Sequence, residues 1–230
     1  MKTIGLIGGM SWESSLEYYR TINKEVNAHL GGLHSAECLL YSVDFAEIER
    51  LQSAGDWQRA GEMLGEVALK LQQAGADFIV ICTNTMHKVV SRIEEEISIP
   101  VLHIADSTAG AIKAQNLTKV GLLGTRYTME QDFYSSHIES HGIEVVVPER
   151  QQRDEINRII FEELVAGELR QASKEYFQQA IHDLVAGGAE GIILGCTEIG
   201  LLIKLEDADV PLFDTAQIHA VQAVKHALEE

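Results

Sequence analysis

The chain has 230 residues, of which 46% are hydrophobic and 23% charged, and its formal net charge is −17 at pH 7. This length allows one large domain or two small ones, and the apolar share is enough for a core. A surface this acidic argues against nucleic acid or an anionic membrane as a partner, but it does not exclude a small anionic substrate.

The sequence carries no sign of export or membrane insertion. No apolar run reaches the length of a membrane span, and the N-terminus lacks the basic-then-apolar pattern of a secretory signal. The three cysteines are an odd number and lie far apart, which does not resemble a disulfide framework. We therefore expect a cytoplasmic protein that functions without disulfides.

The first half of the chain alternates short apolar runs with helical patterns. A Gly-rich turn, Gly8–Trp12, follows the first apolar run. Gly75 should end one helix, and Asp106 should cap another. Strands are expected within residues 2–8, 39–43, 78–81 and 100–102, and helices over 13–29, 60–73, 87–96 and 107–115. The alternation predicts an α/β fold with parallel strands.

The same order begins again after residue 118. The segment Lys119–Thr125 echoes Lys2–Gly8, and Cys196 lies 113 residues after Thr83. The prolines at 100 and 211 lie 111 residues apart. Strands are expected at 119–125, 144–147, 191–194 and 211–213, and helices at 155–164, 174–185 and after residue 214. Offsets this similar indicate an internal duplication of about half the chain.

One strand-to-helix turn occurs in both halves. The first copy is Asp77–His87 and the second is Glu190–Gly200. Each copy opens with an acidic residue, continues through an apolar run and stops at small polar residues. The apolar run is typical of a strand buried on both faces, and the polar residues are typical of a helix start. Each copy should place a small reactive side chain at the carboxyl end of a strand, where open α/β sheets bind ligands.

These repeats predict two parallel-sheet β/α domains related by a pseudo-twofold axis. We expect the first domain to comprise residues 1–103 plus 213–230, and the second 104–212. The helix after Asp106 should cross to the second domain, and the helix capped by Asp214 should cross back. Symmetry would then place Thr83 and Cys196 on opposite walls of one cleft between the domains.

Two proton-transfer groups on opposite faces of a bound carbon suit stereochemical inversion. One group removes a proton from one face, and the other returns a proton to the opposite face. Cysteine can do this because its pKa of about 8.5 is lowered readily at a helix N-terminus. The amides at the two helix starts can hold a substrate carboxylate and stabilise the enolate-like charge that develops when its α-proton leaves.

The two repeated turns, together with the Gly-rich turn near the start of the chain, resemble the aspartate/glutamate racemase superfamily. The resemblance covers essentially the whole chain. The second family motif, Gly-Cys-Thr-Glu, is present as Gly195–Glu198. The first, Cys-Asn-Thr followed shortly by His, is Thr83–His87 here, with threonine in the cysteine position. The resemblance implies an amino-acid racemase without pyridoxal phosphate or any other cofactor, in which Thr83 and Cys196 are the catalytic pair. It also implies that Cys196 serves the L-enantiomer, so we expect racemisation of aspartate or glutamate to be faster from L than from D.

The other two cysteines are expected to pack in the core. Cys82 precedes Thr83, but the repeat aligns Cys82 with Gly195, and one step along a strand turns the side chain to the other face. Cys38 lies in an expected strand, and a small buried apolar role suits both residues.

Further residues are candidates for substrate contact. The resemblance places Met10 on the substrate wall. A side-chain carboxylate on the substrate would favour arginine, for which Arg50, Arg126 and Arg158 lie in plausible places. For the candidate threonines, helix capping and turn formation explain the residue type equally well. The remaining candidates are Asn84, Thr85 and Thr197 for the α-carboxylate, Thr125 and Thr128 for the other side, and Gln52 for a neutral partner.

Related functions would use the same scaffold. These are a broad-specificity racemase of neutral amino acids, a single-cysteine decarboxylase or isomerase, and a non-catalytic amino-acid-binding module. The glycines near the N-terminus do not fit the dinucleotide-binding spacing, no hydrolase elbow is present, and the nine histidines give no paired metal spacing. We therefore predict no metal and no nucleotide. The expected partner is a small amino-acid substrate, without nucleic acid or membrane, and a homodimer is left open.

Overall fold

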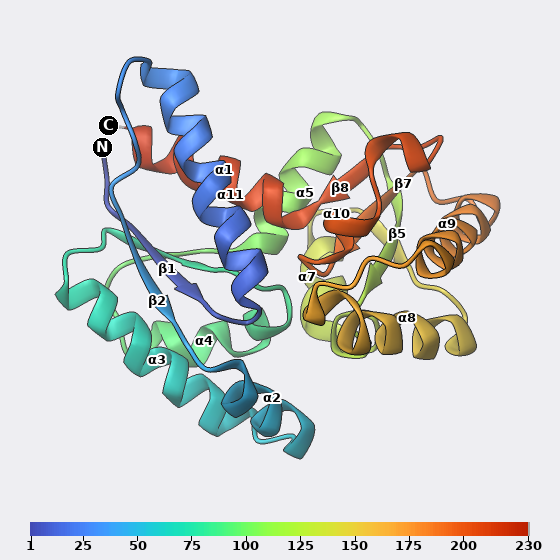
Figure 1. Cartoon of the computed structure of the whole chain (residues 1–230), viewed down its shortest axis with the longest axis horizontal. Helices are drawn as coiled ribbons and strands as arrows, with labels where there is room; N and C mark the ends of the chain where they lie inside the picture. The colour runs from blue at the N-terminus through green and yellow to red at the C-terminus, as the bar shows by residue number, and fades with distance from the viewer. Residues whose placement is uncertain (230) are drawn as a thin grey trace. The chain divides into compact units, whose positions relative to one another are not determined.

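In the computed structural model, which describes residues 1–229, the chain forms two compact units. Unit 1 comprises Met1–Ile104 and the chain from His219 onward, and unit 2 comprises Ala105–Ile218. Each unit is a parallel sheet flanked by helices (Figure 1). The return to unit 1 at His219 differs from the boundary expected at residue 213, because strand β8 (Leu212–Asp214) pairs with β7 (Gly191–Gly195) in the sheet of unit 2.

The sheet of unit 1 has four parallel strands in the order β2-β1-β3-β4. Every residue of β1 and β3 is buried, as expected for continuous apolar runs that are covered on both faces. Strand β2 is an edge strand, so Cys38 at its start is only half-buried and does not lie in the core as predicted. The strands are β1 (Ile4–Gly8), β2 (Cys38–Ser42), β3 (Phe78–Ile81) and β4 (Val101–Leu102).

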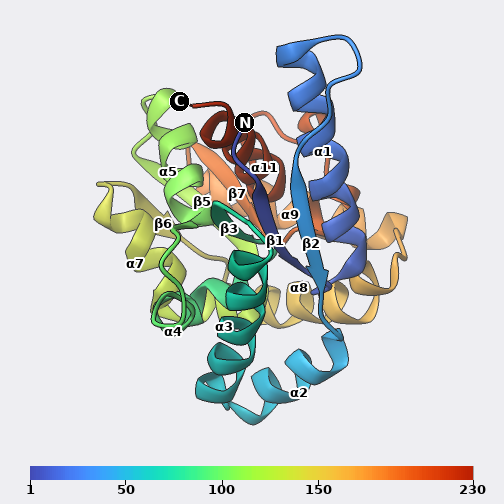
Figure 2. The same ribbon diagram turned by 90° about the vertical axis from the view of Figure 1, so that its left-hand side faces the viewer.

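Helices cover both faces of this sheet. Ile7, Ile79 and Ile81 point into an apolar core that α2 and α3 complete. On the opposite face the ring of Phe78 packs edge-on against His226 of α11, with ring centroids 4.7 Å apart. Figure 2 looks onto unit 1, with β1 and β2 side by side. The helices of unit 1 are α1 (Trp12–Leu30), α2 (Phe45–Ala54), α3 (Trp57–Gln73), the 3-10 helix η1 (Thr85–Val89), α4 (Val90–Glu94) and the later part of α11 (Thr215–Leu228).

The sheet of unit 2 repeats the strand order of unit 1, as β6-β5-β7-β8 with all strands parallel. Helices α8 and α9 pack against β5 (Lys119–Gly124), and α7 packs against β6 (Glu144–Val146). The identical order confirms the predicted α/β fold with two parallel sheets. The helices are α5 (Ile104–Ala114), α6 (Arg126–Glu130), α7 (Asp132–Ser140), α8 (Arg150–Glu162), α9 (Gln171–Ala186) and α10 (Ile199–Leu202), with 3-10 helices η2 (Leu164–Ala166) and η3 (Leu205–Asp207).

Several helices differ from the pattern-based expectation. The short helices α2, α6 and α7 were not predicted, and the single helix expected over 87–96 is divided into η1 and α4. The predicted cap of the last helix is confirmed, because Asp214 precedes α11 and its Oδ1 accepts a hydrogen bond from the Gln217 amide at 3.1 Å. Within residues 1–229 no helix combines the length and apolar character needed to cross a membrane.

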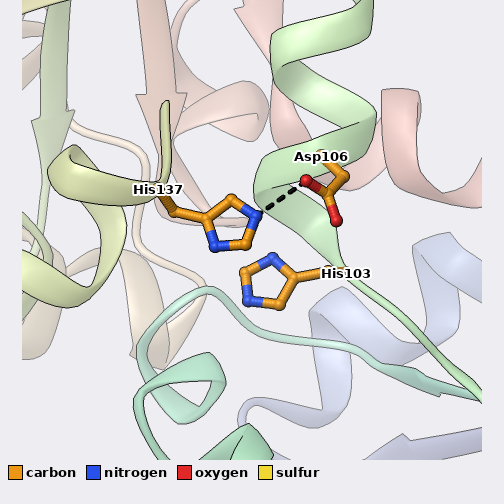
Figure 3. A group of neighbouring side chains, drawn as sticks. All are labelled: His103, Asp106 and His137. Atoms are coloured by element: carbon orange, nitrogen blue, oxygen red, sulfur yellow. Dashed lines mark hydrogen bonds and ion pairs between the residues drawn. The ribbon is translucent and has the colours of Figure 1, made fainter. Parts of the chain in front are cut away.

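The corresponding prediction for Asp106 is wrong. Helix α5 begins at Ile104, so Asp106 lies in its first turn and not before it. Its Oδ1 atom instead accepts hydrogen bonds from His137 Nε2 at 2.7 Å and from His141 Nε2 at 2.8 Å. Figure 3 shows the first of these bonds, and His103, which is also drawn, belongs to unit 1. The carboxylate therefore joins α5 to α7 within unit 2.

Candidate active site

The strand register identifies equivalent positions at the carboxyl ends of the two central strands. Ile81 of β3 pairs with the last residue but one of β1, and Leu194 of β7 pairs with the last residue but one of β5. Thr83 and Cys196 each stand two residues beyond these pairs. The register within each unit thus supports the alignment of Thr83 with Cys196 that the repeat predicted.

In unit 1 the turn after β3 gives Cys82 and Thr83 different surroundings. Cys82 is fully buried, and this burial raises the pKa of its thiol well above the ordinary range. Thr83 is half-buried, whereas Asn84 and Thr85, which follow it, are buried. Cys82 therefore packs in the core, and Thr83 is the more accessible residue of the motif.

Hydrogen bonds link the Gly-rich turn after β1 to the start of α1, and the start of α1 to the turn after β3. Gly9 has a φ of +94°, and a Cβ atom there would lie 2.2 Å from the carbonyl oxygen of Val43, so the turn requires glycine. The Gly9 amide donates to Ser15 Oγ at 2.8 Å, and Ser14 Oγ donates to the carbonyl of Cys82 at 3.3 Å. The first turn of α1 thus fixes the backbone that leads into Thr83.

In unit 2 Cys196 is paired with a buried carboxylate. The Cys196 thiol donates a hydrogen bond to Glu198 Oε2 at 2.9 Å, and the hydroxyl of Thr197 donates to the same oxygen at 2.9 Å. Glu198 itself is 2% exposed. Burial raises the pKa of the Cys196 thiol well above its ordinary value, and the charge of Glu198 and the hydrogen bond to it raise the pKa further. The thiol is therefore protonated at neutral pH, with a carboxylate in position to take its proton.

This raised pKa is the opposite of the lowering expected at a helix start. The helices that follow the two motifs are short, since η1 has five residues and α10 has four. The favourable effect of a helix N-terminus on an anion depends on aligned peptide dipoles, of which so short a helix has few. Burial and the adjacent carboxylate consequently dominate the acidity of Cys196.

Glu198 was not among the predicted site residues. The signal was present in the sequence, because Glu198 closes the Gly-Cys-Thr-Glu motif. Its spacing from Cys196 alone does not indicate contact, since residues two apart share a face on a strand but lie on different faces of a helix, and a helix start is expected after β7. The turn after β7 is what brings its carboxylate to the thiol.

Two buried histidines lie behind the Thr83 turn in unit 1. His87 Nδ1 lies 2.8 Å from the carbonyl oxygen of Thr83, and His219 Nε2 lies 2.9 Å from that of Leu102. Burial lowers the pKa of His87 well below its ordinary value, with the neighbouring histidines His103 and His219 adding to the effect. Burial also lowers the pKa of His219, from 6.5 to about 4. Both rings are therefore neutral at physiological pH.

Comparison with known proteins identifies the family. The sequence matches the Asp/Glu/Hydantoin racemase family over residues 7–223. The chain belongs to this family. A protein from Yersinia pestis, provisionally named an Asp/Glu racemase, is 56% identical with a TM-score of 0.93, and 100% of both chains is covered. PH1733 from Pyrococcus horikoshii OT3, an aspartate racemase homologue, is 38% identical with a TM-score of 0.85, again over 100% of both chains.

A curated relative extends the comparison to substrate range. The broad-specificity amino-acid racemase RacX of Bacillus subtilis is 26% identical over 157 residues, which cover 68% of this chain and 67% of RacX. The relatives are amino-acid racemases, a class of isomerase, and the chain is a racemase of the Asp/Glu racemase family.

All four predicted substrate contacts in unit 1 of the racemase are buried, Asn84 and Thr85 among them. Met10 is 4% exposed and belongs to the same apolar core as Ile7 and Met86. Gln52 of α2 donates through Nε2 to the sulfur of Met86 at 3.0 Å. Because Met86 lies within the Thr83–His87 motif, this hydrogen bond from Gln52 helps to hold the motif in place.

The predicted threonines of unit 2 already serve local structure. Thr125 caps α6, because its Oγ1 accepts a hydrogen bond from the Thr128 amide at 3.3 Å. The hydroxyls of Thr125 and Thr128 lie 3.1 Å apart, and Thr128 is fully buried. Thr125 thus caps α6, Thr128 packs beside it inside the helix, and the Thr197 hydroxyl donates to Glu198.

Two of the three candidate arginines are engaged by carboxylates within unit 2. Arg158 is bound by Glu155, Glu162 and Glu163, and these hydrogen bonds raise the pKa of its guanidinium. Arg126 pairs with Asp154 at 3.2 Å. Arg158 is therefore committed to a structural cluster.

One hydrogen-bonded group of side chains lies away from both motif turns of the racemase. Asp106 Oδ1 in unit 2 accepts from His137 Nε2 and from His141 Nε2, so these three residues satisfy one another by hydrogen bonds.

The buried histidines predict a dependence of stability on acid. The pKa of His219 is about 4 in the folded chain against 6.5 in the unfolded chain, so the unfolded state binds more protons between these values. Its contribution to the free energy of unfolding is therefore complete above pH 6.5 and falls by about 3 kcal/mol as the pH is lowered to 4. Denaturant titrations at pH 7, 6, 5 and 4 on wild type and His219→Gln measure this, because glutamine can still donate to Leu102 but does not titrate. Parallel loss of stability in both proteins would contradict it.

Proposed function

We propose that this racemase inverts the α-carbon of an amino acid by proton transfer on two sides, with Cys196 and Thr83 as the two groups and no cofactor. The observation that carries the proposal is the hydrogen bond from the Cys196 thiol to Glu198 at the strand end that is equivalent to Thr83. Buried thiol and carboxylate at 2.9 Å form a base system, since one can take the proton of the other.

Cys196 acts on the L-enantiomer. Glu198 accepts the thiol proton, and the resulting thiolate removes the α-proton of the substrate, which leaves a protonated thiol and an enolate-like anion. The raised pKa of the Cys196 thiol makes its thiolate a strong base, which suits abstraction from a weakly acidic carbon. Asn84, Thr85 and Thr197 hold the α-carboxylate and stabilise the developing charge.

Thr83 acts on the opposite face. Its hydroxyl passes its proton to the anion as it takes one from solvent, which its half-buried position permits, so no free alkoxide forms in this direction. Glu198 then returns to solvent the proton that it took from Cys196, which closes the cycle. The reverse reaction would need a threonine alkoxide as the base, and an alkoxide is far harder to form than a thiolate. At saturating substrate, racemisation is therefore faster from L than from D, while kcat/KM is the same in both directions because the two enantiomers have equal free energies.

This mechanism takes one proton-transfer group from each domain. We propose that the first domain, residues 1–103 with 213–230, supplies Thr83, and that the second domain, residues 104–212, supplies Cys196. Met10, Gln52, Thr125 and Thr128 act indirectly, through the packing and capping described above.

The proposed substrates are aspartate and glutamate. Two of the similar structures bear aspartate or Asp/Glu racemase names, which favours an acidic side chain. Arg50 and Arg126 are the candidates for binding a second carboxylate, because Arg158 is held by three glutamates. The similarity to RacX makes neutral amino acids the alternative substrate class. The racemase would act on a small molecule in the cytoplasm.

The test is exchange and inversion in deuterated water over a panel of L- and D-amino acids. Wild type should incorporate deuterium at the α-carbon of L-aspartate or L-glutamate faster than at that of the D-enantiomer. Thr83→Cys should raise the D-to-L rate by at least about tenfold, because a thiol replaces an alcohol as the base on that side. Equal L-to-D and D-to-L rates at matched saturation in wild type would refute the directional part. Exchange without inversion would favour a single-cysteine decarboxylase or isomerase, and binding without exchange would favour a binding module.

A further inference from the structure

We propose that His87 is a positioning residue of the racemase, which holds the Thr83 peptide and so directs the Thr83 hydroxyl toward the substrate carbon. The inference rests on the proposed function, because it assigns a role on the Thr83 side of that reaction. Two reactions distinguish this role: inversion, which needs Thr83, and L-face exchange, meaning exchange of the α-proton of an L-amino acid by Cys196 alone. The inference predicts that substitutions of His87 slow inversion much more than L-face exchange.

The two ring nitrogens of His87 have opposite roles. Nδ1 lies 2.8 Å from the carbonyl oxygen of Thr83, which can only accept, so Nδ1 carries the proton. Nε2 accepts the amide hydrogen of Ile104 at 3.2 Å, so Nε2 carries none. The partners thereby assign a single neutral tautomer, and no other side chain offers a donor and an acceptor at these two positions in one rigid ring.

These bonds connect the catalytic turn to the ends of the unit. Ile104 is the last residue before the chain passes to unit 2, and His219 is the first after its return. The rings of His87 and His219 contact each other with centroids 5.8 Å apart. His219 in turn donates from Nε2 to the carbonyl of Leu102 at 2.9 Å and accepts from the Tyr18 hydroxyl at Nδ1, also at 2.9 Å.

The network is buried and saturated. His87 is 2% exposed, and both nitrogens of each ring have a hydrogen-bond partner inside unit 1. Such a network fixes its members more tightly than isolated contacts do, because losing one partner leaves a buried polar group unsatisfied. The Thr83 carbonyl is therefore held in one orientation, and with it the backbone that carries the hydroxyl.

Two substitutions of His87 test its hydrogen bonds to Thr83 and to Ile104 separately. The amide nitrogen of asparagine lies close to the place of Nδ1, so His87→Asn keeps a donor for Thr83 but loses the acceptor for Ile104. Glutamine reaches the place of Nε2, so His87→Gln keeps the acceptor for Ile104 but loses the donor for Thr83. Both variants remove one buried bond, and we expect them to lose stability to a similar extent.

The experiment measures inversion and L-face exchange for both variants in deuterated water. His87→Gln should lower the inversion rate by at least about tenfold while L-face exchange stays within about threefold, since small displacements of a reacting group are costly. His87→Asn should keep both rates within about threefold of wild type. His29 is the matched control, because its Nδ1 also contacts a carbonyl four residues earlier, that of Glu25 at 2.8 Å, on an exposed helix. His29→Gln and His29→Asn should change neither rate.

A second readout does not depend on turnover. In NMR spectra of the full chain, His87→Asn should retain the wild-type carbonyl shift of Thr83 and speed hydrogen exchange at the Ile104 amide, and His87→Gln should do the reverse. Equal loss of inversion in both variants, or unchanged shifts and exchange in both, would overturn the inference. An inactive wild type would refute the proposed function, while the NMR result would still decide whether His87 holds the Thr83 carbonyl.

Discussion

Replacing Cys196 by serine is expected to lower α-proton exchange of an L-substrate by at least about a thousandfold. The substitution keeps a hydroxyl that can donate to Glu198 Oε2, which the thiol reaches at 2.9 Å. It removes the base, because a serine hydroxyl is a far weaker acid than even a buried thiol and is not converted to an anion by a carboxylate. Exchange at the α-carbon in deuterated water, followed by proton NMR, measures the effect directly.

Cys82 provides the control for this substitution. It is also a buried cysteine of a motif turn, and its thiol faces the carbonyl of Val80 at 3.9 Å. Cys82→Ala should lose on the order of 1 kcal/mol of folding free energy through a small cavity and keep exchange within about threefold of wild type. If Cys82→Ala abolished exchange and Cys196→Ser did not, the assignment of the base would be wrong.

Replacing Glu198 by glutamine is expected to lower the same exchange rate by about a hundredfold or more at neutral pH. Glutamine keeps an acceptor oxygen for the Cys196 thiol but cannot take its proton. The loss should shrink as the pH is raised, because hydroxide in solution can then deprotonate the thiol. A pH profile of L-face exchange from pH 7 to 10 measures this, and a constant deficit over that range would contradict the role of Glu198 as the proton acceptor.

The same variant should make the Cys196 thiol more acidic while making the enzyme slower. The charge of Glu198 and the hydrogen bond to it raise the pKa of the thiol, so their removal lowers that pKa. Alkylation rates at Cys196, followed by mass spectrometry as a function of pH, report the change. Glu163→Gln is the control, since Glu163 is also 2% exposed in unit 2 but binds Ser173 and Arg158. That variant should leave both the alkylation profile and the exchange rate near wild type.

The central strands were predictable because their signal is local. A run such as Phe78–Ile81 has no polar face, so it can be stable only as a strand covered on both sides, and the structure buries every one of its residues. The repetition of that signal in Gly191–Gly195 predicted the second sheet, whose strand order proved identical to that of the first. The alignment of Thr83 with Cys196 followed from the same repeat, and the register supports it.

The two predicted capping residues show that the nearby sequence does not decide which partner a carboxylate binds. Asp106 and Asp214 precede similar helical patterns in the sequence, yet only Asp214 caps its helix. Asp106 binds His137 and His141, which lie more than thirty residues along the chain. A carboxylate can satisfy either a helix amide or an imidazole, and which partner is available depends on how α7 packs against α5.

The sequence by itself determined the two parallel sheets, their repeat and the paired positions of Thr83 and Cys196, since each depends on residues that are close in the chain. Only the tertiary structure decided the environment of those positions. It buried Cys196 against Glu198 and so reversed the expected direction of its pKa, and it placed His87 between the Thr83 carbonyl and Ile104. Acidity and orientation depend on burial and on the direction of single hydrogen bonds, which packing fixes and residue order does not.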